Sequence, residues 1–453
     1  GGYVLLTAAW LVAFYRYDVK LTFADMDDDI FWWSLEGSYQ DFGYATSTAI
    51  LAKSMIFEKP EGYSVEAVEE IGEEITEAAQ SVPVGTTPEN LIVIMNESLS
   101  DMRVIRDFET NEEFFPFLKS LTENTIRSNL YVQVFGGGTS NTEYEVLTGN
   151  SMAFLPYVIS AYQAYCKPDE YGMASTLKSQ GYTTVAMHPN VSGNWNRKKV
   201  YTYMGFDEFI SSSGYPDAEH LRNYVSDLGD YQRLISRYEE KKPGEKLFIF
   251  NVTMQNHGGY EESFPDFREE IEALGDTAGY GQANRYLSLM KKSDEAFSYL
   301  IDYFAQVEEP TMIVMFGDHQ AAIETGFYET LYGKSMKELT AEEADKQYVT
   351  PLIIWTNYEM GAEAFDRISA NYLGAKILEL ANLKMTAYDE LLLENWEEIP
   401  ALGKNGYYLA DGTYTAWSKA TEKPEQMRRY QILEYNQVAD REHRVDSLFT
   451  LTP

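Results

Sequence analysis

The sequence predicts an α/β fold in which a mostly parallel central sheet is flanked by helices. Four apolar runs carry this prediction, because their length and β-rich composition are typical of strands that are buried on both faces. Helix-like stretches separate the runs from Pro88 onward, and such alternation of strand and helix favours a doubly wound domain. The four runs are Leu91–Met95, Thr183–Met187, Leu247–Val252 and Met312–Phe316.

Further elements continue the alternation on both sides of these runs. Ser64 is a suitable N-cap for a Glu-rich helix that reaches about residue 79. Beyond residue 360, helical and short Tyr-rich segments predict a smaller C-terminal α+β layer. Two more strands are expected at residues 126–135 and 351–355, and helices after residues 136–138, from about 171, over about 221–238 and 281–304, and near 368–383.

The same patterns divide the chain into four parts. Residues 1–15 form an apolar stretch, 16–85 a helical linker, 86–360 the main α/β domain and 361–453 a smaller C-terminal subdomain. The apolar stretch is shorter than the roughly 20 residues that cross a bilayer. On its residues alone it is either the outer end of a transmembrane helix that begins upstream or a helix of a soluble core.

The composition describes an acidic, folded protein. The formal charge of the 453 residues is −35 and the pI is about 4.5, so the surface repels nucleic acid and we exclude a nucleic-acid partner. An anionic substrate would need local positive charge, from a metal or from basic residues such as Arg197, Lys198 and Lys199. The single cysteine, Cys166, excludes an internal disulfide and a zinc–thiolate centre.

Polar residues follow the four predicted strands at the edge where parallel sheets bind ligands. Three of the five histidines, His188, His257 and His319, lie at these ends. Glu97, Asp318 and His319 together offer two hard oxygens and one imidazole, a set that suits manganese, magnesium or zinc. The alternative for each residue alone is structural, with Glu97 capping a helix and His319 satisfied in the core; the combination favours a metal.

Three glycines, Gly136–Gly138, precede Thr139 at the predicted start of a helix. Glycines allow a close approach of the backbone to a phosphate, and a helix N-terminus favours negative charge. Thr139 is therefore either a simple N-cap or a nucleophile whose hydroxyl is acidified by a metal.

Two further segments offer groups for an anionic polyol. The loop after the second strand runs from His188 through Asn190 and Trp195 to Arg197. A guanidinium suits phosphate oxygens and an indole can wall a small polyol. His257 can bind a phosphate oxygen or protonate a leaving alkoxide. Packing and supporting roles are the alternative for Trp195 and His257 taken alone.

Taken together, these motifs resemble the lipoteichoic acid synthase family, phosphoglycerol transferases of the sulfatase-like branch of the alkaline phosphatase superfamily. The resemblance implies a sulfatase-like domain on the extracytoplasmic side of the cell membrane, and it favours the transmembrane interpretation of residues 1–15. The segments that carry the resemblance are Asn96–Ser98, Gly138–Ser140, His188–Arg197, Asn256–His257 and Gly317–His319, with linker-like Trp33–Gly43 and Lys59–Ser64 and the C-terminal Glu434–Asp440.

The resemblance also implies roles for single residues. Thr139 would attack the phosphorus of phosphatidylglycerol, and a teichoic-acid-type polymer or a glycolipid would accept the phosphoglycerol unit. His257 and Arg197 would hold the phosphate, as catalytic and substrate-binding residues. The implied ligands of one divalent ion, with Mn²⁺ preferred to Mg²⁺ or Zn²⁺, are Glu97, Thr139, Asp318 and His319, and the implied glycerol pocket contains His188, Asn190 and Trp195.

Some residues depart from this pattern and keep alternatives open. Asn190 stands where the family carries an acid against the glycerol, and Gln320-Ala321 where many members have a proline nearby. Thr139 lacks the Cys/Ser-x-Pro-x-Arg context of true sulfatases, and phosphoethanolamine transferases carry several disulfides. The alternatives are a phosphodiesterase or other hydrolase on the same scaffold, and a non-catalytic surface protein that binds polyol phosphate, which would be marked by a broken metal set.

Overall fold

The computed structural model describes residues 57–78, 85–156 and 160–451, together with residues 39, 40, 43, 44 and 47. The expected membrane stretch at residues 1–15 and most of the expected linker therefore lie outside the described residues. Within the described ranges, no helix combines the length and the apolar character needed to cross a membrane.

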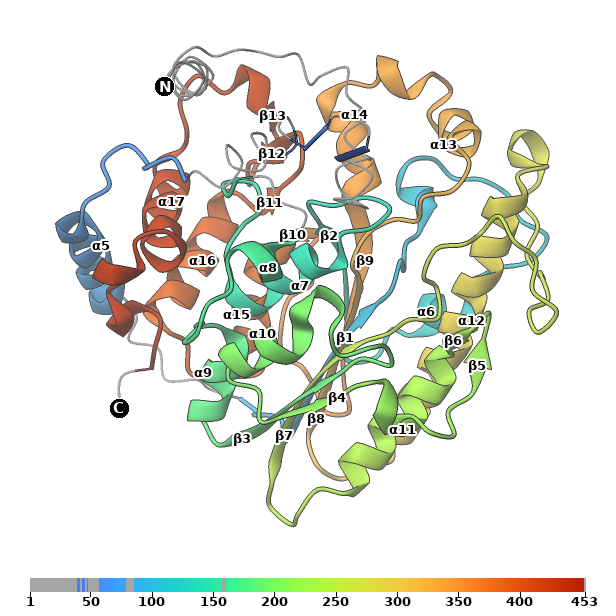
Figure 1. Ribbon diagram of the computed structural model, residues 1–453, viewed down its shortest axis with the longest axis horizontal. Helices are drawn as coiled ribbons and strands as arrows, with labels where there is room; N and C mark the ends of the chain where they lie inside the picture. The colour runs from blue at the N-terminus through green and yellow to red at the C-terminus, as the bar shows by residue number, and fades with distance from the viewer. Residues whose placement is uncertain are drawn as a thin grey trace, which may run out of the picture.

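An eight-stranded sheet forms the centre of the molecule, with the order β10-β2-β9-β8-β1-β7-β3-β4 (Figure 1). β9 is antiparallel to its neighbours β2 and β8, whereas the other neighbouring pairs are parallel. The predicted mostly parallel sheet is thus confirmed. Its strands are β1 (Asn90–Asn96), β2 (Thr125–Tyr131), β3 (Tyr182–Met187), β4 (Glu208–Ile210), β7 (Lys246–Val252), β8 (Thr311–Gly317), β9 (Val349–Thr356) and β10 (Arg367–Ser369).

The central strands are apolar throughout because both faces of the sheet are covered. Along β1, Leu91, Val93 and Met95 pack into one hydrophobic core, and the alternate residues Ile92 and Ile94 pack into the other. Helices α7, α10, α15, α16 and α17 contribute to the first core, and α6, α11, α12 and α13 to the second. Figure 1 shows these two helical layers on either side of the strands.

The helices agree with the sequence pattern except at one start. Ser64 caps α5, since its Oγ accepts from the backbone nitrogen of Ala67 at 3.1 Å. The helix expected from about residue 221 begins only at Asp227, because residues 220–225 form a hairpin. The helices are α5 (Val65–Ala78), α6 (Pro116–Ser120), α7 (Thr139–Thr148), α8 (Ala161–Ala164), α9 (Met173–Ser179), α10 (Arg197–Tyr203), α11 (Asp227–Glu239), α12 (Gly281–Phe304), α13 (Thr325–Tyr332), α14 (Ala341–Asp345), α15 (Ala370–Leu380), α16 (Ala387–Glu398) and α17 (Glu425–Val438).

The chain after residue 360 forms a mixed layer, as predicted. β10 first extends the main sheet by pairing in parallel with β2, and α15 follows it directly. A separate antiparallel sheet then lies between α16 and α17. The small sheets are β11 (Ala401–Leu402), β12 (Gly406–Tyr408) and β13 (Tyr414–Ala416), and the hairpin of β5 (His220–Leu221) and β6 (Tyr224–Val225).

The register of β1 and β8 determines which polar residues lie together at the edge of the sheet. Asn96, the last residue of β1, lies beside Gly317, the last residue of β8. The residues that follow, Glu97 and Asp318, therefore leave the sheet side by side. The parallel arrangement of β7 and β3 with β1 brings the ends of those strands to the same edge.

Candidate active site

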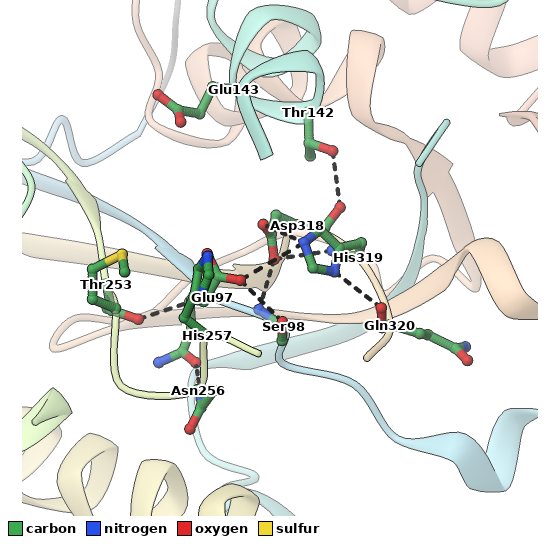
Figure 2. A network of polar contacts seen from close by, with 12 residues as sticks. Glu97, Ser98, Thr142, Glu143, Thr253, Asn256, His257, Asp318, His319 and Gln320 are labelled. Atoms are coloured by element: carbon green, nitrogen blue, oxygen red, sulfur yellow. Dashed lines mark hydrogen bonds and ion pairs between the residues drawn. The ribbon is translucent and has the colours of Figure 1, made fainter. Parts of the chain in front are cut away.

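Glu97, Asp318 and His319 form one buried cluster at this edge (Figure 2). One possible ligand atom from each side chain lies within 4.8 Å of the other two. The Nε2 atom of His319 is 3.2 Å from Asp318 Oδ2 and 3.7 Å from Glu97 Oε1. The structure thus brings together the three side chains that the sequence grouped at the ends of two strands.

Asp318 and His319 face the same cluster although they are neighbours in the chain. Asp318 Oδ1 accepts from the backbone nitrogens of Ser98 and His319 at 2.7 and 3.0 Å, which folds the side chain back over its own backbone. Gly317, which precedes them, leaves no room for a side chain, because a Cβ there would lie 1.8 Å from the carbonyl oxygen of Leu99. Glycine is needed because the exit of β1 presses against the end of β8.

The cluster fits a divalent cation. Among the described residues, the buried atoms Asp318 Oδ2 and His319 Nε2 have no hydrogen-bond partner, which is unusual for atoms of this kind. His319 Nδ1 lies 3.0 Å from the Gln320 carbonyl and must donate to it, so Nε2 keeps its lone pair for a metal. Burial and the neighbouring Asp318 carboxylate raise the pKa of Glu97 to about 8. A bound cation would give the two unpartnered atoms a ligand and would offset the burial and repulsion of the two carboxylates.

The glycine loop before α7 lies tightly against its surroundings. Gly136, Gly137 and Gly138 have φ values of 68°, 156° and 84°, a region that side chains disfavour. Added Cβ atoms would approach Ala322 Cβ to 2.8 Å at Gly136 and Val134 Cγ1 to 2.9 Å at Gly138. Gly138 occupies the N-cap of α7 and Thr139 is the first helical residue. Thr139 is therefore not the N-cap of this helix.

Two hydrogen bonds join this loop and α7 to the segment that carries Asp318 and His319. The backbone nitrogen of Gly136 donates to the Gln320 carbonyl at 2.9 Å. Thr142 Oγ1, one turn after Gly138, donates to the carbonyl of Asp318 at 2.8 Å (Figure 2). These bonds, on either side of Thr139 in the chain, hold the start of α7 against the backbone of Asp318 and Gln320.

A pocket of about 140 Å³ opens above the cluster. It contains eight of the nine residues that the sequence singled out, and Asp318, the ninth, is buried. The eight residues come from the ends of β1, β3, β7 and β8, from the starts of α7 and α10, and from the loop before α10. They are Glu97, Thr139, His188, Asn190, Trp195, Arg197, His257 and His319.

Arg197, in the pocket wall, forms a buried ion pair with Glu143. Its Nε donates to Glu143 Oε1 and Oε2 at 3.0 and 3.3 Å, and its Nη2 also contacts Glu143. Glu143 accepts further from Tyr201 at 2.6 Å and Tyr162 at 3.0 Å. Burial opposes the charge of Arg197, but Glu143 outweighs it and the pKa of Arg197 is raised. The Nε and Nη2 groups of the guanidinium thus face Glu143, and only Nη1 is left for another partner.

Nη1 of Arg197 donates to His188 Nε2 at 3.0 Å. His188 Nδ1 lies 2.9 Å from the carbonyl of Val252 and donates to it. Burial and the charge of Arg197 lower the pKa of His188 well below its usual value, so the ring is neutral. Both ring nitrogens have protein partners, and His188 supports Arg197 from the end of β3.

The remaining predicted residues lie on loops. Trp195 is half-buried with a left-handed φ of 53°. The side chain of Asn190 accepts from the backbone nitrogen of Val191 at 2.7 Å and lies 3.5 Å from Met254 Sδ. His257 is exposed at the pocket, with Nδ1 3.2 Å from the hydroxyl of Tyr224. Desolvation by its neighbours lowers the pKa of His257.

Sequence reasoning missed the partners of these groups, Glu143, Arg222 and Tyr224. α7 has the polar sequence TSNTEYEVLT, yet every one of its residues is buried. A polar helix without an apolar stripe gives no signal of burial. Arg222 and Tyr224 fall in the hairpin where a helix was expected, so their approach to His257 depends on tertiary structure alone.

Replacing Glu143 by glutamine is expected to lower the free energy of unfolding by about 3–5 kcal/mol, because it leaves the buried Arg197 without a counter-charge. Chemical denaturation followed by circular dichroism measures this. The matched control is Glu295→Gln, which breaks an exposed pair with Lys292 and should cost less than about 1 kcal/mol. Equal losses in the two variants would contradict the assigned burial of the Glu143–Arg197 pair.

Fold and site together define a mostly parallel α/β scaffold with a buried cluster at one edge of the sheet that could hold a divalent ion. The chain belongs to the sulfatase family, whose sequence profile, described as Sulfatase, matches residues 89–383. It is 28% identical over 437 residues to the putative cyclic beta-1,2-glucan modification protein of Rhizobium meliloti (strain 1021), covering 92% of this chain and 65% of that protein. It is 26% identical over 269 residues to lipoteichoic acid synthase 1 of Bacillus subtilis (strain 168), covering 56% and 39%.

Among solved structures, the fold is similar to that of the Streptococcus pyogenes phosphoglycerol transferase GacH in complex with sn-glycerol-1-phosphate. The TM-score is 0.72 at 22% identity, with 88% of this chain and 100% of that chain covered. The resemblance to lipoteichoic acid synthases noted in the sequence is thus confirmed. The chain spans about two thirds or less of the length of the two sequence relatives.

Proposed function

We propose that the protein transfers phosphoglycerol from phosphatidylglycerol to a hydroxyl acceptor through a covalent intermediate on Thr139. The observation that carries this is the shared pocket: Thr139 lies at the start of α7, beside Glu97 and His319 of a buried cluster with unpaired ligand atoms. The names of the relatives, a lipoteichoic acid synthase and a phosphoglycerol transferase bound to glycerol phosphate, support the substrate class.

Glu97, Thr139, Asp318 and His319 would hold one divalent ion, with Mn²⁺ preferred and Mg²⁺ or Zn²⁺ as alternatives. When bound, the ion supplies Lewis acidity to the threonine hydroxyl and positive charge to the phosphate oxygens. Arg197 lies in the same wall, but its charge is paired with that of Glu143. The positive charge that an anionic lipid needs at a protein of net charge −35 would therefore come from the ion.

In the first half-reaction, Thr139 Oγ1 gives its proton to solvent and bonds to phosphorus, while the bond from phosphorus to the diacylglycerol oxygen breaks. The diacylglycerol oxygen takes up a proton from solvent and leaves as an alcohol. A glycerophospho-threonine remains. His257 lines the pocket, where a neutral imidazole would donate a hydrogen bond to a phosphate oxygen. Trp195 and Asn190 wall the side of the pocket where the glycerol would lie, and His188 keeps Arg197 in place.

In the second half-reaction, an acceptor hydroxyl bonds to the phosphorus and the Thr139 oxygen leaves and regains a proton. The acceptor is a teichoic-acid-type polymer or a glycolipid. We place this chemistry in residues 86–360, with 361–453 as a supporting subdomain. Residues 1–15 would end a transmembrane helix, which holds the catalytic domain on the extracytoplasmic side of the cell membrane, close to its lipid donor.

A lipid assay tests the proposed function. Phosphatidylglycerol with a fluorescent acyl chain is incubated with the protein and manganese, and diacylglycerol is separated by thin-layer chromatography. We expect manganese-dependent release of diacylglycerol, with the glycerophosphate unit recovered on an added glycolipid rather than in water. Free glycerophosphate in place of a modified acceptor would instead identify a hydrolase. No release of diacylglycerol with the metal bound would contradict phosphatidylglycerol as the donor.

A further inference from the structure

The hairpin of β5 and β6, before α11, has an unusual turn. Its two turn residues, Arg222 and Asn223, have φ values of 53° and 74°, and the strands pair Leu221 with Tyr224 across them. Turns with two left-handed residues favour Asn-Gly, and the left-handed conformation is unfavourable for an arginine. Strain of this kind persists where the surrounding structure requires it.

The contacts that require this turn are made by the side chain of Arg222, which is only 1% exposed. Its Nη2 donates to the carbonyls of His257 and Gly258 at 3.2 and 3.1 Å. The guanidinium carbon lies 5.3 Å from the ring centroids of both Tyr260 and Phe264, a distance at which cation–π attraction operates. The arginine thus holds the backbone of the loop that carries His257.

The same hairpin contacts the imidazole itself. The hydroxyl of Tyr224 is 3.2 Å from His257 Nδ1, and the two ring centroids are 5.4 Å apart. A phenol is the better donor of this pair when the imidazole is neutral. If Tyr224 donates to Nδ1, the ring proton must lie on Nε2, and Nε2 is the nitrogen left for the pocket.

We propose that the β5–β6 hairpin positions His257 for the reaction. Arg222 fixes the loop backbone, and Tyr224 fixes the ring and its tautomer, so that the Nε2–H group is presented to an oxygen of the bound phosphate. Arg222 and Tyr224 are positioning residues, since they act through His257. What His257 does to the substrate rests on the proposed function, whereas its orientation and tautomer do not.

The tautomer is measured without any substrate, by long-range ¹H–¹⁵N correlation of the histidine rings at neutral pH. The five histidines give few signals, and His257 is assigned by its loss in His257→Gln. We expect the Nε2–H pattern in the wild-type protein and a changed pattern in Tyr224→Phe. The control Tyr303→Phe loses a surface hydrogen bond of the same kind, to Glu239, and should leave the His257 signals unchanged. An Nδ1–H pattern in the wild-type protein, or an unchanged ring in Tyr224→Phe, would overturn the proposal.

A double-mutant cycle on diacylglycerol release gives the kinetic test. Tyr224→Phe is expected to lower kcat about tenfold with little change in KM, and to have no effect in a His257→Ala background, because residues that act through one another are not additive. An equal fall in both backgrounds would show that Tyr224 acts independently of His257. If the lipid is not a substrate at all, the proposed function fails, and the spectroscopic result still decides the role of the hairpin.

Discussion

Replacing Thr139 by alanine is expected to abolish diacylglycerol release, with a loss of at least about 1,000-fold, because a missing nucleophile cannot be replaced by the remaining groups. The fold should survive the change. Gly138, not Thr139, occupies the N-cap of α7, and alanine is a strong helix former. The measurement is the rate of diacylglycerol release, with circular dichroism as the test of folding.

Two further variants separate the loss of the hydroxyl from a general effect of the substitution. Thr139→Ser keeps a hydroxyl on the same backbone and should retain measurable turnover. Thr325→Ala is the matched control, since Thr325 is also the first residue of a helix, α13, but is exposed and does not line the pocket; it should behave as the wild-type protein. Retained activity in Thr139→Ala would rule out the covalent route and leave direct attack by water or by the acceptor.

The second large effect concerns Asp318. Asp318→Asn keeps the shape of the side chain and an oxygen for the Ser98 and His319 nitrogens, but it removes one of two buried negative charges. We expect loss of manganese binding and of turnover, each by at least about 100-fold, since a divalent ion needs anionic oxygen ligands. Isothermal titration with manganese and the diacylglycerol assay measure the two losses.

Stability in the absence of metal should move in the opposite direction. Burial and, after it, repulsion by Asp318 raise the pKa of Glu97. Because the variant removes this repulsion, the Asp318→Asn protein in EDTA should unfold at an equal or higher temperature than the wild type. Saturating manganese should stabilise the wild type, by about 2.7 kcal/mol at one hundred times the dissociation constant, and leave the variant unchanged. Asp276→Asn, on the exposed surface, is the control. Equal stabilisation of Asp318→Asn by manganese would contradict the assigned ligand set.

Most of the sheet and the cluster of Glu97, Asp318 and His319 could be predicted from the sequence because the signals are local. A fully apolar run such as Leu91–Met95 identifies a central strand, and the polar residue that follows it must lie at the edge of the sheet. The register that places Asn96 beside Gly317 then brings Glu97 and Asp318 together. The parallel pairing of β1 and β8 therefore brings residues that are far apart in the sequence into one cluster.

The rest depends on contacts between distant segments. The ion pair of Arg197 with Glu143 joins the start of α10 to the middle of α7, and a charged residue in a polar helix is normally exposed. The sequence therefore favours Arg197 as a free phosphate ligand, whereas the structure shows it held by Glu143 and His188. Likewise, Arg222 in a left-handed turn conflicts with local preference, and its contact with the His257 loop is visible only in three dimensions.

Mass spectrometry of the peptide that contains Thr139 tests whether this threonine is the nucleophile. The purified protein is incubated with phosphatidylglycerol and manganese, without an acceptor, and digested at once. We expect a glycerophosphate adduct on Thr139 in the wild-type protein and none in EDTA. A protein that releases diacylglycerol under the same conditions while Thr139 stays unmodified, even after rapid quenching, would contradict the covalent threonine mechanism.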